Sequence, residues 1–169
     1  PQPIGFSKGQ YTIRNGRRSS SANAFLKPAK RRPNLTVHTR ALATRILMNG
    51  TTANGIEYLH KGKTVSAGAN QEVILSGGVF NTPQLLMLSG VGPASHLKEF
   101  GIECIVDLPV GKNLQDHLVV SNFWSRPNNT SPFREELRYD KIAVSMVRAY
   151  LFGTGPATVV PGGMHAFLK

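Results

Sequence analysis

Four short segments rich in β-branched and aliphatic residues follow one another in the first half of the chain, and turn residues bound each of them. Such segments, joined by Asn-Gly or Lys-Gly pairs, are typical of antiparallel strands connected by tight hairpins. The pattern therefore predicts a β-meander. The predicted strands are residues 35–39, 43–48, 55–60 and 63–68, with turns at Asn49–Gly50, Asn54–Gly55 and Lys61–Gly62.

The next segment, EVILS at residues 72–76, is a continuous apolar run that predicts a buried strand. Gly77 and Gly78 follow it, and a helix is expected over residues 82–89, with Thr82 as its N-cap and a stop at Ser89. A second helix is predicted over residues 93–101. After it we expect a strand at residues 102–110 and a loop at 111–118.

The two flanks of this region have a different character. Before it, a turn at Asn15–Gly16 precedes a short helix that Ser19 or Ser20 caps and Pro28 ends. After residue 118 a loop-rich stretch leads into a helical pattern and a final strand. The expected class is a mixed α/β (α+β) fold. We place a domain boundary near residue 118, so that residues 1–117 form one part and 118–169 begin another.

Composition narrows the class of protein. The 169 residues are 40% hydrophobic and 17% charged, which is typical of a folded chain rather than a disordered one. No apolar run is long enough to cross a membrane as a helix. Because the chain starts at Pro1 and ends at Lys169 after an apolar stretch, we interpret it as an internal piece of a larger protein.

The formal net charge of +11 suggests an anionic partner such as nucleic acid. The densest basic cluster, residues 27–33, lacks interleaved aromatic residues, zinc-ligand spacing and a helix-turn-helix pattern, so no nucleic-acid partner is expected. The histidines show no metal-ligand spacing, and no metal site is expected. Cys104 lies in an apolar run and is expected to be a small buried residue.

The Gly77–Gly78 pair at a helix start is the strongest candidate for chemistry. Without side chains, these residues let a ligand approach the backbone closely, and the helix N-terminus offers free N–H groups. A tight connection with no ligand would produce the same pattern, and the dinucleotide fingerprint G-x-G-x-x-G is absent. Spacing alone leaves both interpretations open.

The stretch GGVFNTPQLLMLSGVG, residues 77–92, resembles the second signature of the glucose–methanol–choline (GMC) flavoprotein oxidoreductases. Val79 departs from the small residue usual in that signature. The resemblance continues in GRRSSSANAFLKPAKRRPNLTV, EVILSGG and PVGKNLQDHL, and it covers residues 5–120 in the family's order. The matching positions in the signature are Thr82, Pro83, Leu85, Leu86, Ser89, Gly90, Val91 and Gly92.

This resemblance implies part of a Rossmann-like FAD-binding domain with a β-meander, followed by the start of a substrate domain. Ala43 would meet the adenine of FAD through its main chain. Ser76, Gly77 and Gly78 would border the flavin, with Thr82 nearby. A loop that carries the remaining predicted contacts would close over the cofactor. Those loop residues are Asn113, Asp116 and His117.

The family's activity would be oxidation of the CH–OH group of an alcohol, with hydride transfer to flavin N5. The diphosphate loop and the catalytic histidine would lie outside this chain, so no catalytic residue is assigned and the chain alone is expected to be inactive. The alcohol, the electron acceptor (oxygen, a quinone or another carrier), the oligomeric state and the compartment stay open, with the cytoplasm as default. The alternatives are a non-redox FAD lyase of the same fold, a basic nucleic-acid-binding module, and a structural fragment whose site never assembles.

Overall fold

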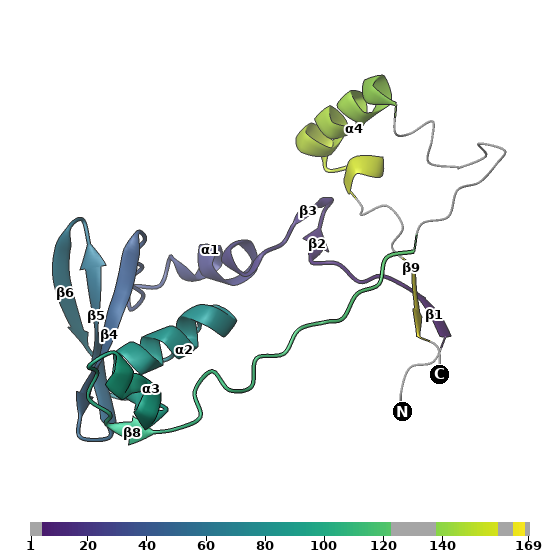
Figure 1. The fold of residues 1–169 in the computed structure, drawn as a ribbon. Coiled ribbons are helices and arrows are strands. Elements are labelled where there is room, and N and C mark those ends of the chain that lie inside the picture. The colour runs from purple at the N-terminus through teal and green to yellow at the C-terminus, as the bar shows by residue number, and fades with distance from the viewer. Residues whose placement is uncertain (1–4, 123–137, 159–163, 168–169) are drawn as a thin grey trace. The chain divides into compact units, whose positions relative to one another are not determined.

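The computed structural model describes residues 5–122, 138–158 and 164–167 (Figure 1). The chain forms two compact units, one made of residues 38–120 and the other of residues 1–37 together with 121–169. The expected mixed α/β class is confirmed, because each of the two units contains both an antiparallel sheet and helices. The domain boundary predicted near residue 118 stays a prediction.

A three-stranded antiparallel sheet is the centre of the unit 38–120. Its strands β4 (Ala41–Asn49), β5 (Thr52–His60) and β6 (Lys63–Gly68) lie in the order β4-β5-β6, which confirms the predicted meander. The predicted turn at Asn54–Gly55 is wrong. Gly55 lies inside β5 and pairs with both Leu47 and Gly68, because two neighbouring strands satisfy its backbone where a turn would leave it unpaired.

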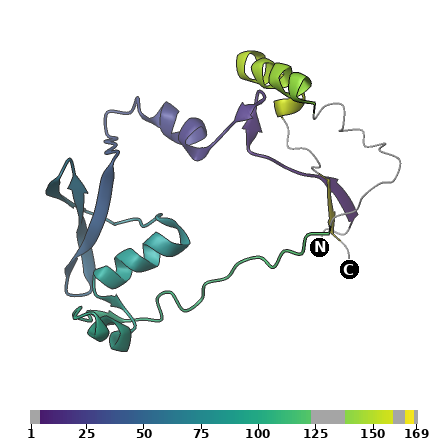
Figure 2. The same ribbon diagram turned by 45° about the horizontal axis from the view of Figure 1, so that its top comes forward.

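The helices of this unit pack beside the sheet. Helix α2 (Gly78–Leu88) lies against β4, and the turned view in Figure 2 shows the same arrangement. The chain then forms β7 (Val91–Gly92), α3 (Ala94–Glu99) and β8 (Val106–Asp107), and β7 pairs with β8 in parallel. The buried apolar side chains among the described residues are Ile46, Val91 and Leu97.

Two predicted strands of this region are not present, and a third is shorter than expected. Residues 72–76 run without regular structure, and Ile74 is 74% exposed. Residues 35–38 are likewise irregular, and of the strand expected over 102–110 only Val106–Asp107 forms. An apolar run becomes a strand only where another strand takes up its backbone hydrogen bonds. No described strand pairs with residues 72–76.

The other unit contains two small antiparallel pairs. Strand β1 (Gly5–Lys8) pairs with β9 (Met164–Phe167), and β2 (Ile13–Arg14) pairs with β3 (Arg17–Arg18). The turn predicted between β2 and β3 is confirmed, because Asn15 and Gly16 both have positive φ angles, 52° and 67°.

The predicted short helix of this unit is longer than expected. A π-helical turn, η1 (Ala22–Leu26), continues directly into α1 (Lys27–Ala29), so the prediction that Pro28 ends the helix is wrong. Proline lacks an N–H group, but the first turn of α1 does not require one. The N-cap of η1 is Ser21, which makes no side-chain capping bond, while Ser20 Oγ accepts the Asn23 N–H at 3.4 Å.

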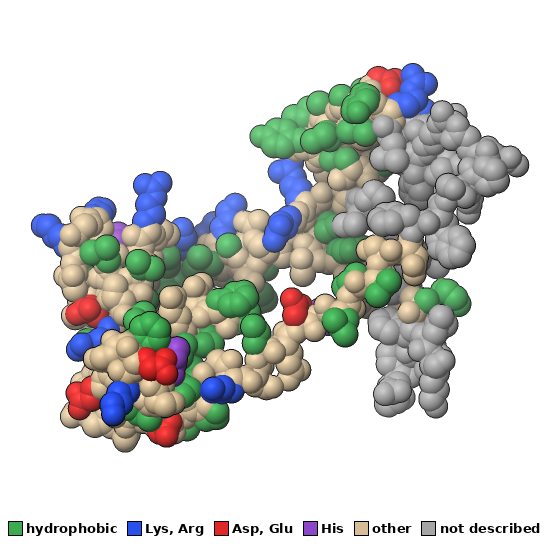
Figure 3. All heavy atoms as spheres, in the orientation of Figure 1, with side chains coloured by type: hydrophobic (Ala, Val, Ile, Leu, Met, Phe, Trp, Pro, Cys, Tyr) green, Lys and Arg blue, Asp and Glu red, His purple; other side chains and the backbone are tan. Residues whose placement is uncertain are grey.

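Helix α4 (Tyr139–Phe152) confirms the helical pattern predicted to follow the loop-rich stretch after residue 118, for the part of it that the structure describes. It ends at Gly153, and a turn of 3-10 helix, η2 (Pro156–Thr158), follows. The Arg17 guanidinium donates to the Tyr150 carbonyl at 2.9 Å, which ties the β2–β3 hairpin to the end of α4. Exposed hydrophobic side chains gather along α4 (Figure 3). Within the described ranges, no helix has the length and hydropathy to cross a bilayer.

Candidate functional site

A pocket of about 390 Å³ lies where the sheet, the segment after it and α2 meet. This volume is within the usual range for small-molecule sites. The pocket belongs wholly to the unit 38–120, and none of its lining residues is charged. Its lining residues are Ala41, Leu42, Ala43, Ile56, Ile74, Leu75, Ser76, Gly77, Asn81, Thr82, Gln84, Leu85 and Leu88.

The pocket brings together predicted residues from separate stretches of sequence. Ala43 comes from β4, and Ser76, Gly77 and Thr82 come from the segment that leads into α2 and from α2 itself. Gly78 is the first residue of α2. Its φ angle is +87°, and the position of a Cβ there is open space, so a ligand could approach the backbone at this residue.

The start of α2 differs from the prediction. The helix begins at Gly78, so Thr82 is not its N-cap and Pro83 lies inside the helix. Thr82 Oγ1 instead accepts the Gly77 N–H at 3.0 Å, and Asn81 Nδ2 donates to the Gly77 carbonyl at 3.1 Å. These two side chains satisfy both backbone groups of Gly77, which lets the helix start ahead of the expected cap. A Cβ at Gly77 would lie 3.1 Å from Asn81 Cβ, so the residue is also closely packed on one side.

These features fit part of the FAD molecule that the resemblance implies. The lining is mostly aliphatic, and the Ile74 side chain within it is largely exposed, which suits a flat aromatic ring. The beginning of α2 offers unpaired N–H groups to a polar or anionic group. The pocket lining contains no cation and no G-x-G-x-x-G loop, so the described residues do not account for the diphosphate.

The three predicted loop residues lie elsewhere. Asn113, Asp116 and His117 are exposed in an irregular segment after β8, and they do not line the pocket. Asn113 Oδ1 accepts a hydrogen bond from Gln115 Nε2 at 2.8 Å, and Asp116 Oδ1 accepts the backbone N–H of His117 at 2.7 Å. Asp116 therefore bonds to the main chain of His117 and not to its ring. Contact of these residues with a cofactor stays a prediction.

A cluster of rings at one end of the sheet was not predicted. His38 Nδ1 lies 2.8 Å from the Tyr58 hydroxyl, and the His38 and His60 rings are stacked with centroids 5.5 Å apart. The buried Nδ1 atom of His60 has no hydrogen-bond partner. Tyr58 and His60 are two positions apart on β5 and so share a face of the sheet, but nothing in the sequence placed His38 beside them. The described residues contain no group of three side chains suited to hold a metal ion.

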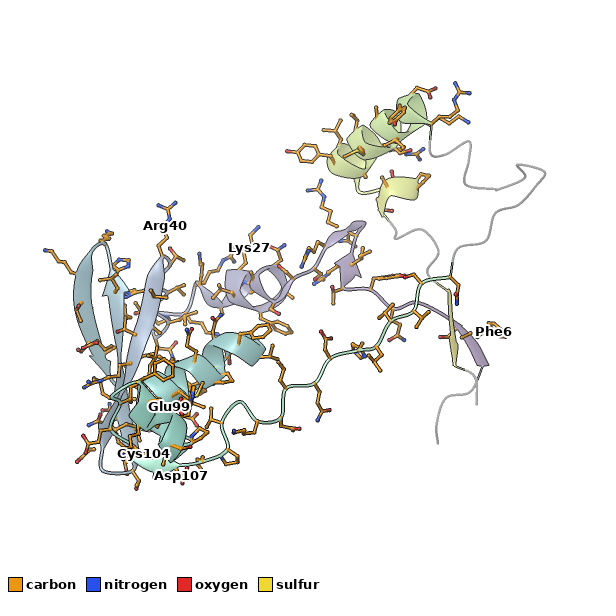
Figure 4. The ribbon with its side chains drawn as sticks, in the orientation of Figure 1. Phe6, Lys27, Arg40, Glu99, Cys104 and Asp107 are labelled. Atoms are coloured by element: carbon orange, nitrogen blue, oxygen red, sulfur yellow. The ribbon has the colours of Figure 1, made fainter. Side chains whose placement is uncertain are left out.

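The expectation that Cys104 is buried is wrong. Cys104 is exposed, and its thiol lies 3.9 Å from the Gly92 carbonyl. It precedes the β8 strand, in the region where Figure 4 labels Cys104 and Asp107. The apolar run around it forms only a two-residue strand, so most of the run is not covered by a neighbouring strand.

Ser89 is a buried residue whose contact with β4 was also not predicted. The sequence marked it as the end of a helix, which is confirmed, since it is the C-cap of α2. Its hydroxyl in addition links α2 to β4, because Oγ accepts the Ile46 N–H at 2.8 Å. Its place one residue after the apolar helix pattern indicated a cap, but no local signal identified the strand partner.

A mostly apolar pocket beside a glycine turn that leads into a helix is suited to bind a small molecule. The family model for GMC oxidoreductase matches residues 2–119 of the chain. The chain therefore belongs to the GMC oxidoreductase family.

Individual relatives agree with this assignment. The chain is 50% identical over 120 residues to the mitochondrial choline dehydrogenase of Homo sapiens, which covers 70% of this chain and 20% of the human protein. It is 51% identical over 118 residues to the oxygen-dependent choline dehydrogenase of Brucella ovis, which covers 69% of this chain and 21% of that protein. The matched part thus spans about a fifth of these curated relatives.

The fold is also similar to solved structures. An R554K variant of formate oxidase from Aspergillus oryzae RIB40, a structure concerned with FAD modification, matches with a TM-score of 0.73 at 32% identity. The match covers 91% of this chain and 27% of the formate oxidase chain. The likeness supports the expected class of fold over most of the chain.

Proposed function

We propose that the protein to which this chain belongs is an FAD-dependent oxidoreductase that acts on the CH–OH group of an alcohol. The observation that carries the proposal is the meeting of Ala43 from β4 with Ser76, Gly77 and Thr82 in one pocket. The family resemblance singled out these residues for contact with FAD, although they come from separate stretches of sequence.

Each of these residues has a distinct part in the proposal. The main chain of Ala43 meets the adenine, while Ser76, Gly77 and Gly78 border the flavin ring and leave room for it. The start of α2 and Thr82 hold the glycine backbone in place beside that ring. Asn113, Asp116 and His117 belong to a segment that closes over the cofactor. FAD, when bound, supplies an acceptor for a hydride from the alcohol carbon.

The named relatives guide the choice of substrate. Two of them are choline dehydrogenases, and one of these names oxygen as its acceptor. A small alcohol of the choline type is therefore the first substrate to test. Formate oxidase, which has a similar fold, acts on a molecule that is not an alcohol, so the fold alone does not determine the substrate.

The test uses the protein as it is made from its natural gene. We expect the purified protein to show the visible absorption of bound flavin, and choline or another small alcohol to bleach it when oxygen is excluded. A protein that stays colourless after FAD is added would contradict the proposal. Bound flavin that no alcohol bleaches would favour the non-redox lyase.

A further inference from the structure

We propose that Ser89 is a positioning residue that sets the separation of the two walls of the cofactor pocket. This inference rests on the proposed function, because it assigns to Ser89 a part in FAD affinity. Ser89 does not line the pocket, and no contact with the cofactor is assigned to it.

The hydroxyl of Ser89 makes two hydrogen bonds in a buried place. Its Oγ accepts the Ile46 N–H at 2.8 Å and donates to the Leu85 carbonyl at 2.6 Å. Ser89 is only 4% exposed, and Ile46 is 5% exposed. Water therefore has little access to replace either bond, and loss of the hydroxyl would leave a buried N–H without an acceptor.

The hydrogen bond that Ser89 accepts from Ile46 matters because β4 is an edge strand. Among the described residues, the sheet order β4-β5-β6 leaves one side of β4 without a neighbouring strand. Backbone groups on such an edge need partners from outside the sheet when they are buried. Ser89 provides one to Ile46, and it does so from the end of the helix that packs on this strand.

The same bond joins the two walls of the pocket. One wall is the beginning of β4, at residues 41–43, and the other is α2, through Thr82, Leu85 and Leu88. Ser89 directly follows Leu88, and it also holds the carbonyl of Leu85. The pairing of β4 with β5 shifts register between Ala43 and Arg45, just before Ile46. The hydrogen bond at Ile46 therefore holds β4 immediately after the register shift.

The experiment compares Ser89→Ala with two matched variants in the protein made from its natural gene. Leu97→Val removes a methylene group from a side chain that is 1% exposed and does not line the pocket, so it destabilises the same unit without removing a hydrogen bond between β4 and α2. Thr44→Val removes a β4 hydroxyl that bonds to Glu57 within the sheet, at 3.1 Å, and does not link strand to helix. The readouts are the dissociation constant for FAD and amide hydrogen exchange in the FAD-free protein.

We expect Ser89→Ala to weaken FAD binding by about tenfold at a temperature where all variants are folded. Amide exchange should accelerate on both walls, at residues 41–46 and 82–88. Leu97→Val and Thr44→Val should leave the dissociation constant within about twofold of the original. If Ser89→Ala does not fold, Ser89→Cys replaces it, because a thiol of similar size is a much weaker hydrogen-bonding group.

Unchanged FAD affinity in Ser89→Ala would overturn the inference, and so would an equal loss in Leu97→Val, since general destabilisation would then explain both. If the unsubstituted protein binds no FAD, the proposed function fails. In that case amide hydrogen exchange still tests whether Ser89 positions the two walls of the pocket. Faster exchange on both walls in Ser89→Ala alone supports the positioning role, and exchange confined to Ile46 contradicts it.

Discussion

Gly90 is the residue at which the end of α2 meets the strand pair β7–β8. Its carbonyl accepts the N–H groups of Ile105, at 2.8 Å, and of Val106, at 3.2 Å. Its φ angle is +85°, and a Cβ built there would lie 2.7 Å from the Glu103 carbonyl oxygen and 2.9 Å from Ile105 Cγ1. Both the backbone conformation and the lack of space therefore require glycine at this position.

We predict that Gly90→Ala lowers the free energy of unfolding by about 3 kcal/mol or more, because strain and a backbone clash add together. Gly101→Ala is the matched control. Its φ angle is +67°, but a Cβ there meets nothing within 4 Å, so only the conformational strain of about 1 kcal/mol applies. Urea unfolding of both variants measures the difference. Equal effects would show that space at Gly90 is not limiting.

At the scale of an element, helix α2 shows how side-chain hydrogen bonds determine the residue at which a helix begins. Its N-cap, Gly77, has no side chain to accept a hydrogen bond. Thr82 and Asn81 reach back one turn and bond to the N–H and the carbonyl of Gly77. The helix therefore starts next to the glycine turn, and its first turn lies at the pocket.

We predict that Thr82→Val destabilises this first turn by about 0.5–1 kcal/mol, because the Gly77 N–H loses its acceptor and the bond is not deeply buried. Thr82→Ser keeps the hydroxyl, so its free energy of unfolding should be close to that of the original protein. Urea unfolding monitored by circular dichroism gives both values. A similar loss in Thr82→Ser would assign the effect to the threonine methyl group.

Charge is the property that acts at the scale of the whole molecule. The chain has 20 Lys and Arg residues against 9 Asp and Glu, a net charge of +11. Ion pairs such as Arg138–Asp140 join residues close in sequence, and both side chains are more than half exposed. Such exposed pairs contribute little to stability, so repulsion among the remaining cations is largely uncompensated. Figure 4 labels Arg40 just before the beginning of β4, one of the exposed cations of the sheet unit.

We predict that a rise in sodium chloride from about 20 to about 300 mM increases the melting temperature by several degrees, because salt screens this repulsion. Lys112→Glu, in an exposed loop, lowers the net charge and should reduce the salt effect. Thermal unfolding of both proteins at the two salt concentrations measures this change in melting temperature. An effect of the same size in Lys112→Glu, or a melting temperature independent of salt, would contradict the explanation.

Local patterns in the sequence were sufficient for several elements of the fold. The meander follows from short apolar segments joined by hairpin residues, and α3 and α4 follow from helical spacing. These predictions succeed because the information lies within a few residues of each position. The family resemblance also names Ala43, Ser76, Gly77 and Thr82 for contact with FAD; they line one pocket, and their contact with the cofactor stays a prediction.

The features that needed the tertiary structure depend on partners distant in sequence. Residues 72–76 have a strand's composition, but no described strand pairs with them. The His38, Tyr58 and His60 rings meet because the sheet and the segment before it bring them together. The bond from Ser89 to Ile46 forms because α2 packs against an edge strand that leaves a buried N–H without a partner. The sequence by itself determined the meander, the helices and the family motif, and packing decided where the helices begin, which apolar runs become strands and which backbone groups these elements satisfy for one another.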